Sequence, residues 1–115
     1  MLNQTSPFVF EAPNGILSGR DRGEALLVQL MDHLRDIDSD AVTPLDFSNV
    51  SFIDISCADE FLSKLLMRIG SGELGNRFAF IENANDSVRE TFEAVLKLRD
   101  LAALFKNDDG SIVVL

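Results

Sequence analysis

The alternation of short apolar runs with longer stretches of helical spacing most constrains the fold of this chain. Apolar residues that recur every three or four positions predict helices with one buried face, and they occupy residues 26–37, 58–69 and 88–96. Short runs rich in Val, Ile, Leu and Phe predict strands, and they occupy residues 8–10, 16–17, 42–47, 78–81 and 112–115, with residues 50–53 continuing the third of these segments. Strands joined through helices are most simply parallel, with right-handed crossovers. The pattern therefore predicts an α/β fold.

The predicted elements follow the order β-β-α-β-α-β-α-β in a single domain, residues 1–115. The Pro-Asn-Gly sequence at residues 13–15 is typical of a tight turn, so we expect the first two strands to form a hairpin. This gives a mixed, mostly parallel sheet of about five strands with three to four helices. Residues 98–105 either continue the third helix or form a short second piece. Pro44 indicates an edge strand, a strand start or a bulge.

Three helix starts carry residues whose side chains can accept hydrogen bonds from free helix amides. Asp21 is predicted to cap the first helix, and Glu24 three residues later completes a capping box. Ser56 is predicted to cap the second helix, and Asn85 or Asp86 the third. Ser56 thereby lies at a strand-to-helix junction.

Length and charge exclude several classes of function. The chain has 115 residues and a formal net charge of −9, so it offers no basic patch for nucleic acid or for an anionic membrane surface. No apolar run approaches the roughly 20 residues of a membrane span, and no direct membrane insertion is expected. The lone cysteine, Cys57, allows no internal disulfide and fits a reducing compartment. Without a secretory leader, a cytoplasmic location is expected.

Few residues here are arranged for catalysis or cofactor binding. Residues 70–75 spell G-x-G-x-x-G, but they follow a helix and precede a strand, which is the reverse of a dinucleotide site, so no cofactor is expected. His33 is interpreted as a surface residue, and a single His with a single Cys argues against zinc. Cys57 is interpreted as a packed side chain rather than a redox centre. With no nucleophile, base and orienting group assembled, an enzyme is not expected.

The Ser56 hydroxyl lies at a helix N-terminus, where free N–H groups and the helix dipole favour anions. A phosphate on Ser56 would be attracted there, but it would also add about 1.5–2 negative charges beside Asp54, Asp59 and Glu60. The alternative is that Ser56 serves only as an N-cap, worth about 1 kcal/mol. The residues alone favour the capping role, because many helices begin with serine.

Residues 45–56, L-D-F-S-N-V-S-F-I-D-I-S, resemble the central L-D-L-S-x-V-x-F-I-D-S-S-G motif of STAS domains, the fold of anti-sigma factor antagonists. Residues 85–105 resemble the third-helix region of that family after its N-x-x-V-R start. Residues 56–62 are similar to a divergent STAS-like branch with S-F-A-D-E-L. The resemblance covers nearly the whole chain. It departs from the central motif at Ile55, which replaces a serine, and at Cys57, which replaces a glycine.

The resemblance implies a regulatory protein-interaction module in which Ser56 is the phospho-acceptor. A partner serine kinase of the GHKL ATPase fold, itself an anti-sigma factor or a sensor kinase, would bind the unmodified chain and release it on phosphorylation. A separate phosphatase would restore the complex. The kinase would supply ATP and Mg²⁺. The resemblance places the partner contact at residues near Ser56, namely Asp21, Asp54, Ile55, Cys57, Ala58 and Asp59.

A second hypothesis keeps the same resemblance without phosphorylation. STAS domains also occur as accessory subunits of phospholipid importers and as tails of anion transporters. On this hypothesis the chain is a constitutive adaptor, either a signalling scaffold or a subunit of a transport complex, and Ser56 is only a cap.

Overall fold

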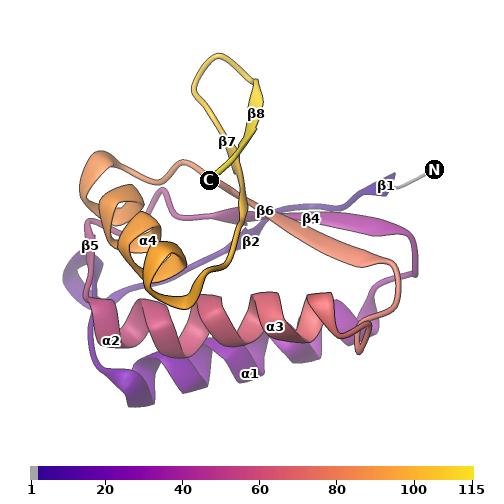
Figure 1. Cartoon of the computed structure of the whole chain (residues 1–115), viewed down its shortest axis with the longest axis horizontal. Coiled ribbons are helices and arrows are strands. Elements are labelled where there is room, and N and C mark those ends of the chain that lie inside the picture. Colours follow the sequence, from indigo (N-terminus) through magenta and orange to yellow (C-terminus); the bar gives the residue numbers. More distant parts are fainter. Residues whose placement is uncertain (1–2) are drawn as a thin grey trace.

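The computed structural model describes residues 3–115 and contains one large sheet with helices against it (Figure 1). Its six strands are β1 (Asn3–Gln4), β2 (Phe8–Val9), β4 (Ala41–Asp46), β6 (Arg77–Glu82), β7 (Leu104–Lys106) and β8 (Ile112–Val114). β1 and β2 both pair with one side of β4, and the order continues β4-β6-β7-β8. Every pairing in this sheet is parallel except that of β7 with β8. The predicted α/β fold with a mixed, mostly parallel sheet is confirmed.

The helices gather on one face of the sheet, as Figure 1 shows. They are α1 (Arg20–Asp36), α2 (Ile55–Ala58), a π-helical turn (Asp59–Ser63), α3 (Lys64–Gly70) and α4 (Asp86–Arg99). α2, the π-helical turn and α3 follow one another without a break, so residues 55–70 act as one long helix. Most of the predicted periodic positions are buried, among them Leu26, Leu30, Leu34, Phe61, Leu62, Leu65, Phe92 and Val95. Ile37, Leu66 and Ile69 are partly buried.

Phenylalanine rings fill the space between the sheet and the helices. Phe10 stacks on Phe47 with ring centres 4.3 Å apart, and Phe61 meets Phe10 edge-on at 5.2 Å. Phe92 of α4 lies 5.0 Å from Phe47 and 6.4 Å from Phe105 of β7. These five rings are at most 2 % exposed, so they hold the sheet, the long helix and α4 in one core.

The N-terminal hairpin that the sequence predicts does not form. Pro13–Gly15 do form a turn, with Asn14 and Gly15 at φ +54° and +77°. The next strand, β3 (Ile16–Leu17), does not return along β2 but pairs in parallel with β5 (Phe52–Ile53). Hydrogen bonds from Ser51 N to Gly15 O and from Asp54 N to Leu17 O fix this pairing. The prediction of a turn at residues 13–15 is confirmed. The pairing partner of β3 lies 36 residues away, and the residues around the turn do not indicate a partner so distant in the chain.

Pro44 occupies a central strand rather than an edge, a strand start or a bulge. In β4 the carbonyls of Val42 and Asp46 accept hydrogen bonds from the N-terminal segment, so alternation points the proline nitrogen to the same side. On that side β1 ends at Gln4 and β2 begins at Phe8. The proline nitrogen, which has no hydrogen to donate, therefore faces the gap between β1 and β2. The sheet loses little backbone hydrogen bonding at this position.

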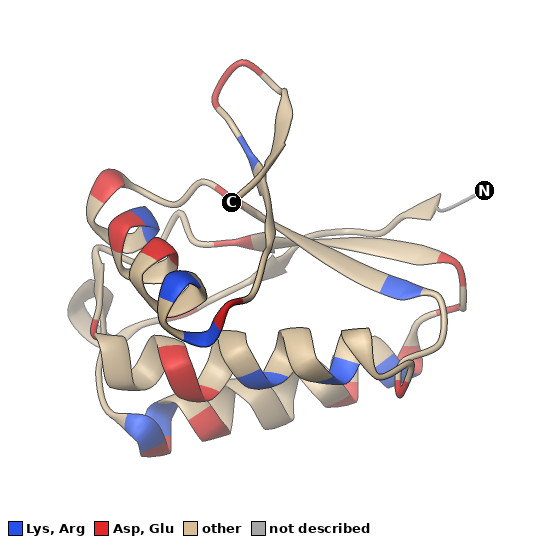
Figure 2. Ribbon diagram, viewed as in Figure 1, with Lys and Arg blue, Asp and Glu red and all other residues tan. Residues whose placement is uncertain are grey.

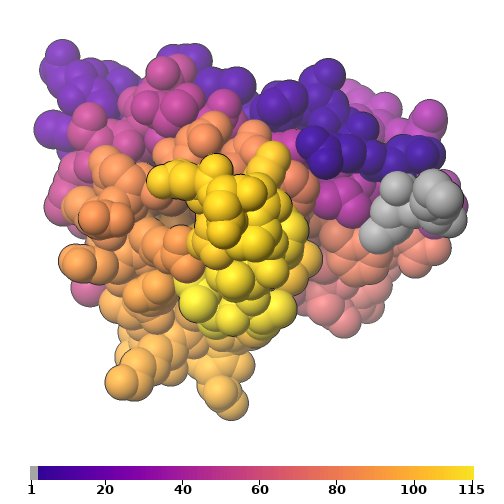
Figure 3. All heavy atoms as spheres, turned by 90° about the horizontal axis from the view of Figure 1, so that it is seen from above, coloured from indigo at the N-terminus to yellow at the C-terminus, as the bar shows by residue number. Residues whose placement is uncertain are grey.

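The C-terminal region also differs from the prediction. α4 ends at Arg99 because Asp100 adopts a left-handed conformation, φ +55°. Residues 104–106 form a strand, β7, where a continued or second helix was predicted. Leu101, Ala103 and Phe105 alternate with more exposed residues, which is a strand period. β7 and β8 form a hairpin that projects from the sheet, shown in yellow near the centre of Figure 3.

Candidate functional site

The strand-to-helix junction at residues 54–58 is built around Asp54, not around Ser56. Asp54 precedes the first residue of α2, and its Oδ1 accepts a hydrogen bond from Cys57 N at 2.8 Å. Ser56 is the second residue of the helix, and its hydroxyl makes no hydrogen bond within residues 3–115. The prediction that Ser56 caps this helix is therefore wrong. A cap residue lies just before the helix, where its side chain can accept a hydrogen bond from the amide three residues later. Asp54 has this position, whereas Ser56 is already inside the helix.

Asp54 also ties this junction to the start of α1. Its Oδ2 accepts a hydrogen bond from the Ser18 hydroxyl at 2.8 Å and one from Gly19 N at 3.1 Å. Partial burial raises the pKa of Asp54, but the hydrogen bonds from Cys57 N, Ser18 and Gly19 outweigh it, and the net pKa lies below the ordinary value. Asp54 is therefore ionised near neutral pH and occupied by three donors.

The first helix begins at Arg20, and its N-cap is Gly19, at φ +86°. The predicted cap and capping box at Asp21 and Glu24 are therefore wrong, because Asp21 lies inside the first turn. Asp21 is exposed there, and the Asp54 bonds to Ser18 and Gly19 bring the start of α1 beside the junction.

Cys57 and Ala58 are both 0 % exposed and pack in the core. Their side chains are consequently not part of a surface that a partner can touch, unlike the contact set implied by the resemblance. Burial, followed by the Asp54 charge, raises the pKa of the Cys57 thiol to about 11, although Arg22 opposes the change. This agrees with the interpretation of Cys57 as a packed side chain, because the reactive form of cysteine is the thiolate.

Around Ser56 lies a surface that we call the Ser56 surface, made of Ile16, Phe52, Asp54, Ile55 and Ser56. Ile16 and Phe52 are register partners on β3 and β5, so their side chains share one face. The side chains of Ile16, Phe52 and Ile55 are 49 %, 44 % and 53 % exposed. Ser56, which follows Ile55 in the chain, is half-buried. Exposed large apolar side chains on paired strands, followed directly by an exposed Ile55 and a free hydroxyl, make this junction a candidate interaction surface.

Asp59 is buried inside the protein and does not lie on a surface where a partner could contact it, although the resemblance implied such a contact. It is 4 % exposed, and Arg99 at the end of α4 donates to both of its oxygens, at 2.8 and 2.6 Å. Ser63 donates at 2.8 Å and Arg20 at 3.2 Å. The Arg99 bonds lower the pKa of Asp59 strongly against the opposing effect of burial. Asp59 thus joins α1, the long helix and α4. Acidic and basic positions are interspersed along these helices, as the red and blue segments of Figure 2 show.

Sequence reasoning missed this network because Arg20 and Arg99 lie about 40 residues from Asp59, on two other helices. The signal available was Asp59 itself, an acidic residue on the apolar side of a predicted helix. A carboxylate on a buried face needs partners, which are most often arginines.

The remaining sequence features carry no assembled site. The glycine-rich residues 70–75 form the turn between α3 and β6, in the order that the sequence predicted. His33 is half-buried against Phe8, at 5.2 Å, rather than a solvated surface residue. Within residues 3–115, no three His, Cys, Asp or Glu side chains lie close enough together to hold a metal ion. Over the same range, none of the helices has the length and apolar character that crossing a bilayer requires.

Comparisons of the chain with protein-family models, with curated proteins and with solved structures found no match.

Proposed function

We propose that this protein is a regulatory protein-interaction module whose Ser56 surface binds a partner and is switched by phosphorylation of Ser56. The catalytic step belongs to the partner, a serine kinase of the GHKL ATPase fold that acts as an anti-sigma factor or a sensor kinase. A phosphatase reverses the modification, and the cycle runs in the cytoplasm, where ATP is supplied.

The observation that carries this proposal is the free hydroxyl of Ser56. The competing explanation for a serine at this position is helix capping, and Asp54 already performs that role. The Ser56 hydroxyl makes no hydrogen bond within residues 3–115, and the residue is partly exposed. A hydroxyl that stabilises nothing is available to a kinase, and its neighbours Ile16, Phe52 and Ile55 supply an apolar contact area.

Phosphorylation would act through local charge. A phosphate on Ser56 adds about 1.5–2 negative charges two residues from Asp54, whose carboxylate is already held ionised by its three donors. Within a bound complex, that charge would have to be desolvated against the apolar side chains of the Ser56 surface. Both effects oppose binding of the same partner, so modification releases it.

The contact set that supports this proposal is narrower than the one implied by the resemblance. Ile55, Ser56 and Asp54 lie at the surface, with Asp21 nearby on α1. Cys57 and Ala58 are buried in the core beneath the junction, and the Asp59 carboxylate is hydrogen-bonded to Arg99.

The test is capture of the partner from a lysate of the source organism, with bound proteins identified by mass spectrometry. Wild type, Ser56→Asp and Ser87→Asp serve as baits. Ser87 is a matched control because it is also the second residue of a helix whose cap is a side-chain oxygen, that of Asn85. We expect wild type and Ser87→Asp to retain a GHKL-type ATPase and Ser56→Asp to lose it.

The captured ATPase is then incubated with the chain, ATP and Mg²⁺, and the phosphorylated position is mapped. Phosphate on Ser56 is the expected result. If all three baits hold the same partner and no phosphate reaches Ser56, the phosphorylation switch is excluded and the chain is a constitutive adaptor.

A further inference from the structure

The outer edge of β2 is an unpaired strand edge on the side of the molecule opposite β7. Among the strands of residues 3–115, β2 pairs only with β4, and Phe10 N continues that pairing by donating to Asp46 O at 3.0 Å. Backbone groups alternate sides along an extended chain, so those of Val9 and Glu11 point away from β4. The chain is still extended at Ala12, φ −138° and ψ +124°.

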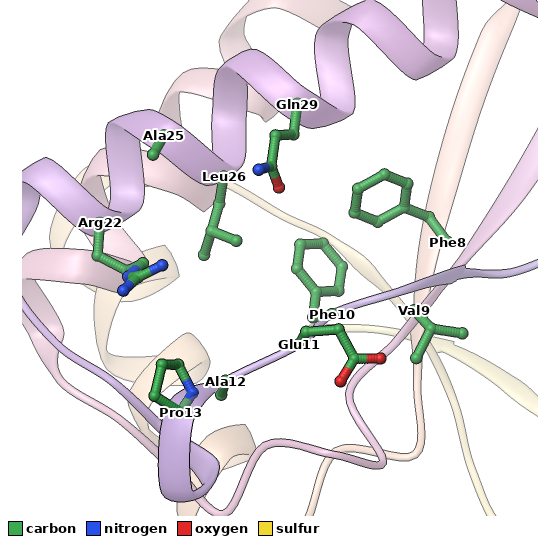
Figure 4. A pocket seen from close by; sticks show the side chains of 10 residues that line it. All are labelled: Phe8, Val9, Phe10, Glu11, Ala12, Pro13, Arg22, Ala25, Leu26 and Gln29. Atoms are coloured by element: carbon green, nitrogen blue, oxygen red, sulfur yellow. The ribbon is translucent and has the colours of Figure 1, made fainter.

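A groove of about 430 Å³ runs between this edge and α1. Its apolar lining includes Phe8, Ala25 and Leu26, and Figure 4 shows Arg22 and Gln29 reaching toward it from the helix. Arg22, Ala25, Leu26 and Gln29 follow the spacing of one helix face. Ala25 leaves room on that face, because its side chain is a single methyl group between two long polar ones.

The polar side chains of the groove have few partners among the residues that the structure describes. The side chains of Arg22 and Gln29 form no hydrogen bond or ion pair with any other residue from 3 to 115. Glu11, on the strand side, receives only a long hydrogen bond from Asn49, at 3.4 Å. The groove therefore offers an apolar floor, a free guanidinium and a weakly bonded carboxylate beside open backbone donors and acceptors.

We propose that this groove binds an extended segment of a partner protein, which adds to β2 as a further strand. The segment is about five residues long, since residues 8–12 span roughly 13 Å at 3.3 Å per residue. Its backbone pairs with Val9 and Glu11, an apolar side chain packs on Phe8 and Leu26, and a carboxylate pairs with Arg22. This is strand addition at a sheet edge, with side-chain pockets giving selectivity.

A peptide segment fits this site better than a second copy of the chain. Each copy carries a net charge of −9, so pairing two edges would bring like charges together. Pro7 and Pro13 also bracket the open edge, and prolines interrupt continuous pairing between long edges. A short window between two prolines suits a short partner segment.

The experiment uses a phage-displayed library of random ten-residue peptides, selected on the wild-type chain. Synthetic copies of the enriched peptides are titrated by fluorescence anisotropy against wild type and five variants, one of which is the Ser56→Asp bait described above. Val9→Pro removes the outward N–H, and Val9→Thr is its control because it keeps both the N–H and the branched shape. Arg22→Glu reverses the groove charge, and Lys97→Glu makes the same charge change on exposed α4.

We expect enriched peptides to contain an acidic residue and to bind Val9→Pro and Arg22→Glu at least tenfold more weakly than wild type. Val9→Thr, Lys97→Glu and Ser56→Asp should bind like wild type, because this groove does not depend on the Ser56 switch. Hydrogen exchange on the unmodified chain gives a second readout that needs no variant: the bound peptide should slow exchange of the Val9 and Glu11 amides.

Three results would overturn the proposal. One is that no peptide is enriched. Another is that enriched peptides bind Val9→Pro and Arg22→Glu as tightly as wild type and leave the Val9 and Glu11 amides unprotected. The third is a wild-type dimer in sedimentation analysis that Val9→Pro dissolves, which would assign the edge to a second copy of the chain.

Discussion

Replacing Asp54 by alanine should destabilise the protein far more than replacing Ser56, and the difference follows from the junction geometry. Asp54→Ala removes the N-cap bond to Cys57, worth about 1 kcal/mol, together with the bonds from Ser18 and Gly19. Hydrogen bonds to a charged acceptor contribute about 1.5–3 kcal/mol each, and at this partly exposed position we expect about 1–2 kcal/mol from the Ser18 and Gly19 bonds together. We expect a total loss of about 2–3 kcal/mol.

Urea unfolding followed by circular dichroism measures this difference. With a slope of about 1.5 kcal/mol per molar urea, the Asp54→Ala midpoint should fall by about 1.5–2 M. Ser56→Ala should shift the midpoint by less than about 0.3 M, since the Ser56 hydroxyl forms no hydrogen bond with any of residues 3–115. The reasoning would be refuted by a Ser56→Ala loss of about 1 kcal/mol alongside a near-neutral Asp54→Ala, because that pattern belongs to a serine cap.

Three further predictions test other contacts. Gly23→Ala should lose about 1–3 kcal/mol in urea unfolding, because a Cβ there would lie 2.5 Å from Cys57 O, and a loss below 0.5 kcal/mol would contradict this close packing. The ion pair of Asp59 should make wild type less stable as pH falls below 3.8: its folded pKa is lowered, so its contribution is full above the unfolded value and is lost as pH falls toward the folded one. Melting temperatures from pH 5 to 2 should show that loss in wild type and a shallower one in Arg99→Ala, and parallel curves would exclude it. Cys57 in the folded chain should react with a thiol reagent at pH 8 at least 100-fold more slowly than after unfolding, and equal rates would contradict its burial and its pKa of about 11.

Local patterns predicted the elements whose residues sit on one repeating face. Most of the periodic apolar positions of the three helices are buried as expected, and Asn85 caps α4 by accepting a 2.8 Å hydrogen bond from Val88 N. These features succeed because helix periodicity and capping are decided within a few residues. β1 was not predicted, because it depends on a contact with a distant part of the chain. Its two polar residues, Asn3 and Gln4, are strand only because they pair with β4.

The candidate site was less predictable, because its parts come from distant segments. The choice between Asp54 and Ser56 as the cap depends on where the helix begins, and element boundaries are the least certain product of a sequence pattern. Gly19 and Ser18 reach Asp54 across about 35 residues, and Arg99 reaches Asp59 across 40. Such contacts depend on how the helices pack together, which the sequence does not show at any single position.

Affinity of the purified partner for the chain tests the central proposal most directly. Calorimetric titration would compare wild type, Ser56→Asp and Ser87→Asp, after thermal melts show that all three are folded. The proposed switch predicts that Ser56→Asp binds at least tenfold more weakly, whereas Ser87→Asp binds like wild type. Equal dissociation constants for all three proteins would contradict a switch at Ser56 and would leave the Ser56 surface without a regulatory role.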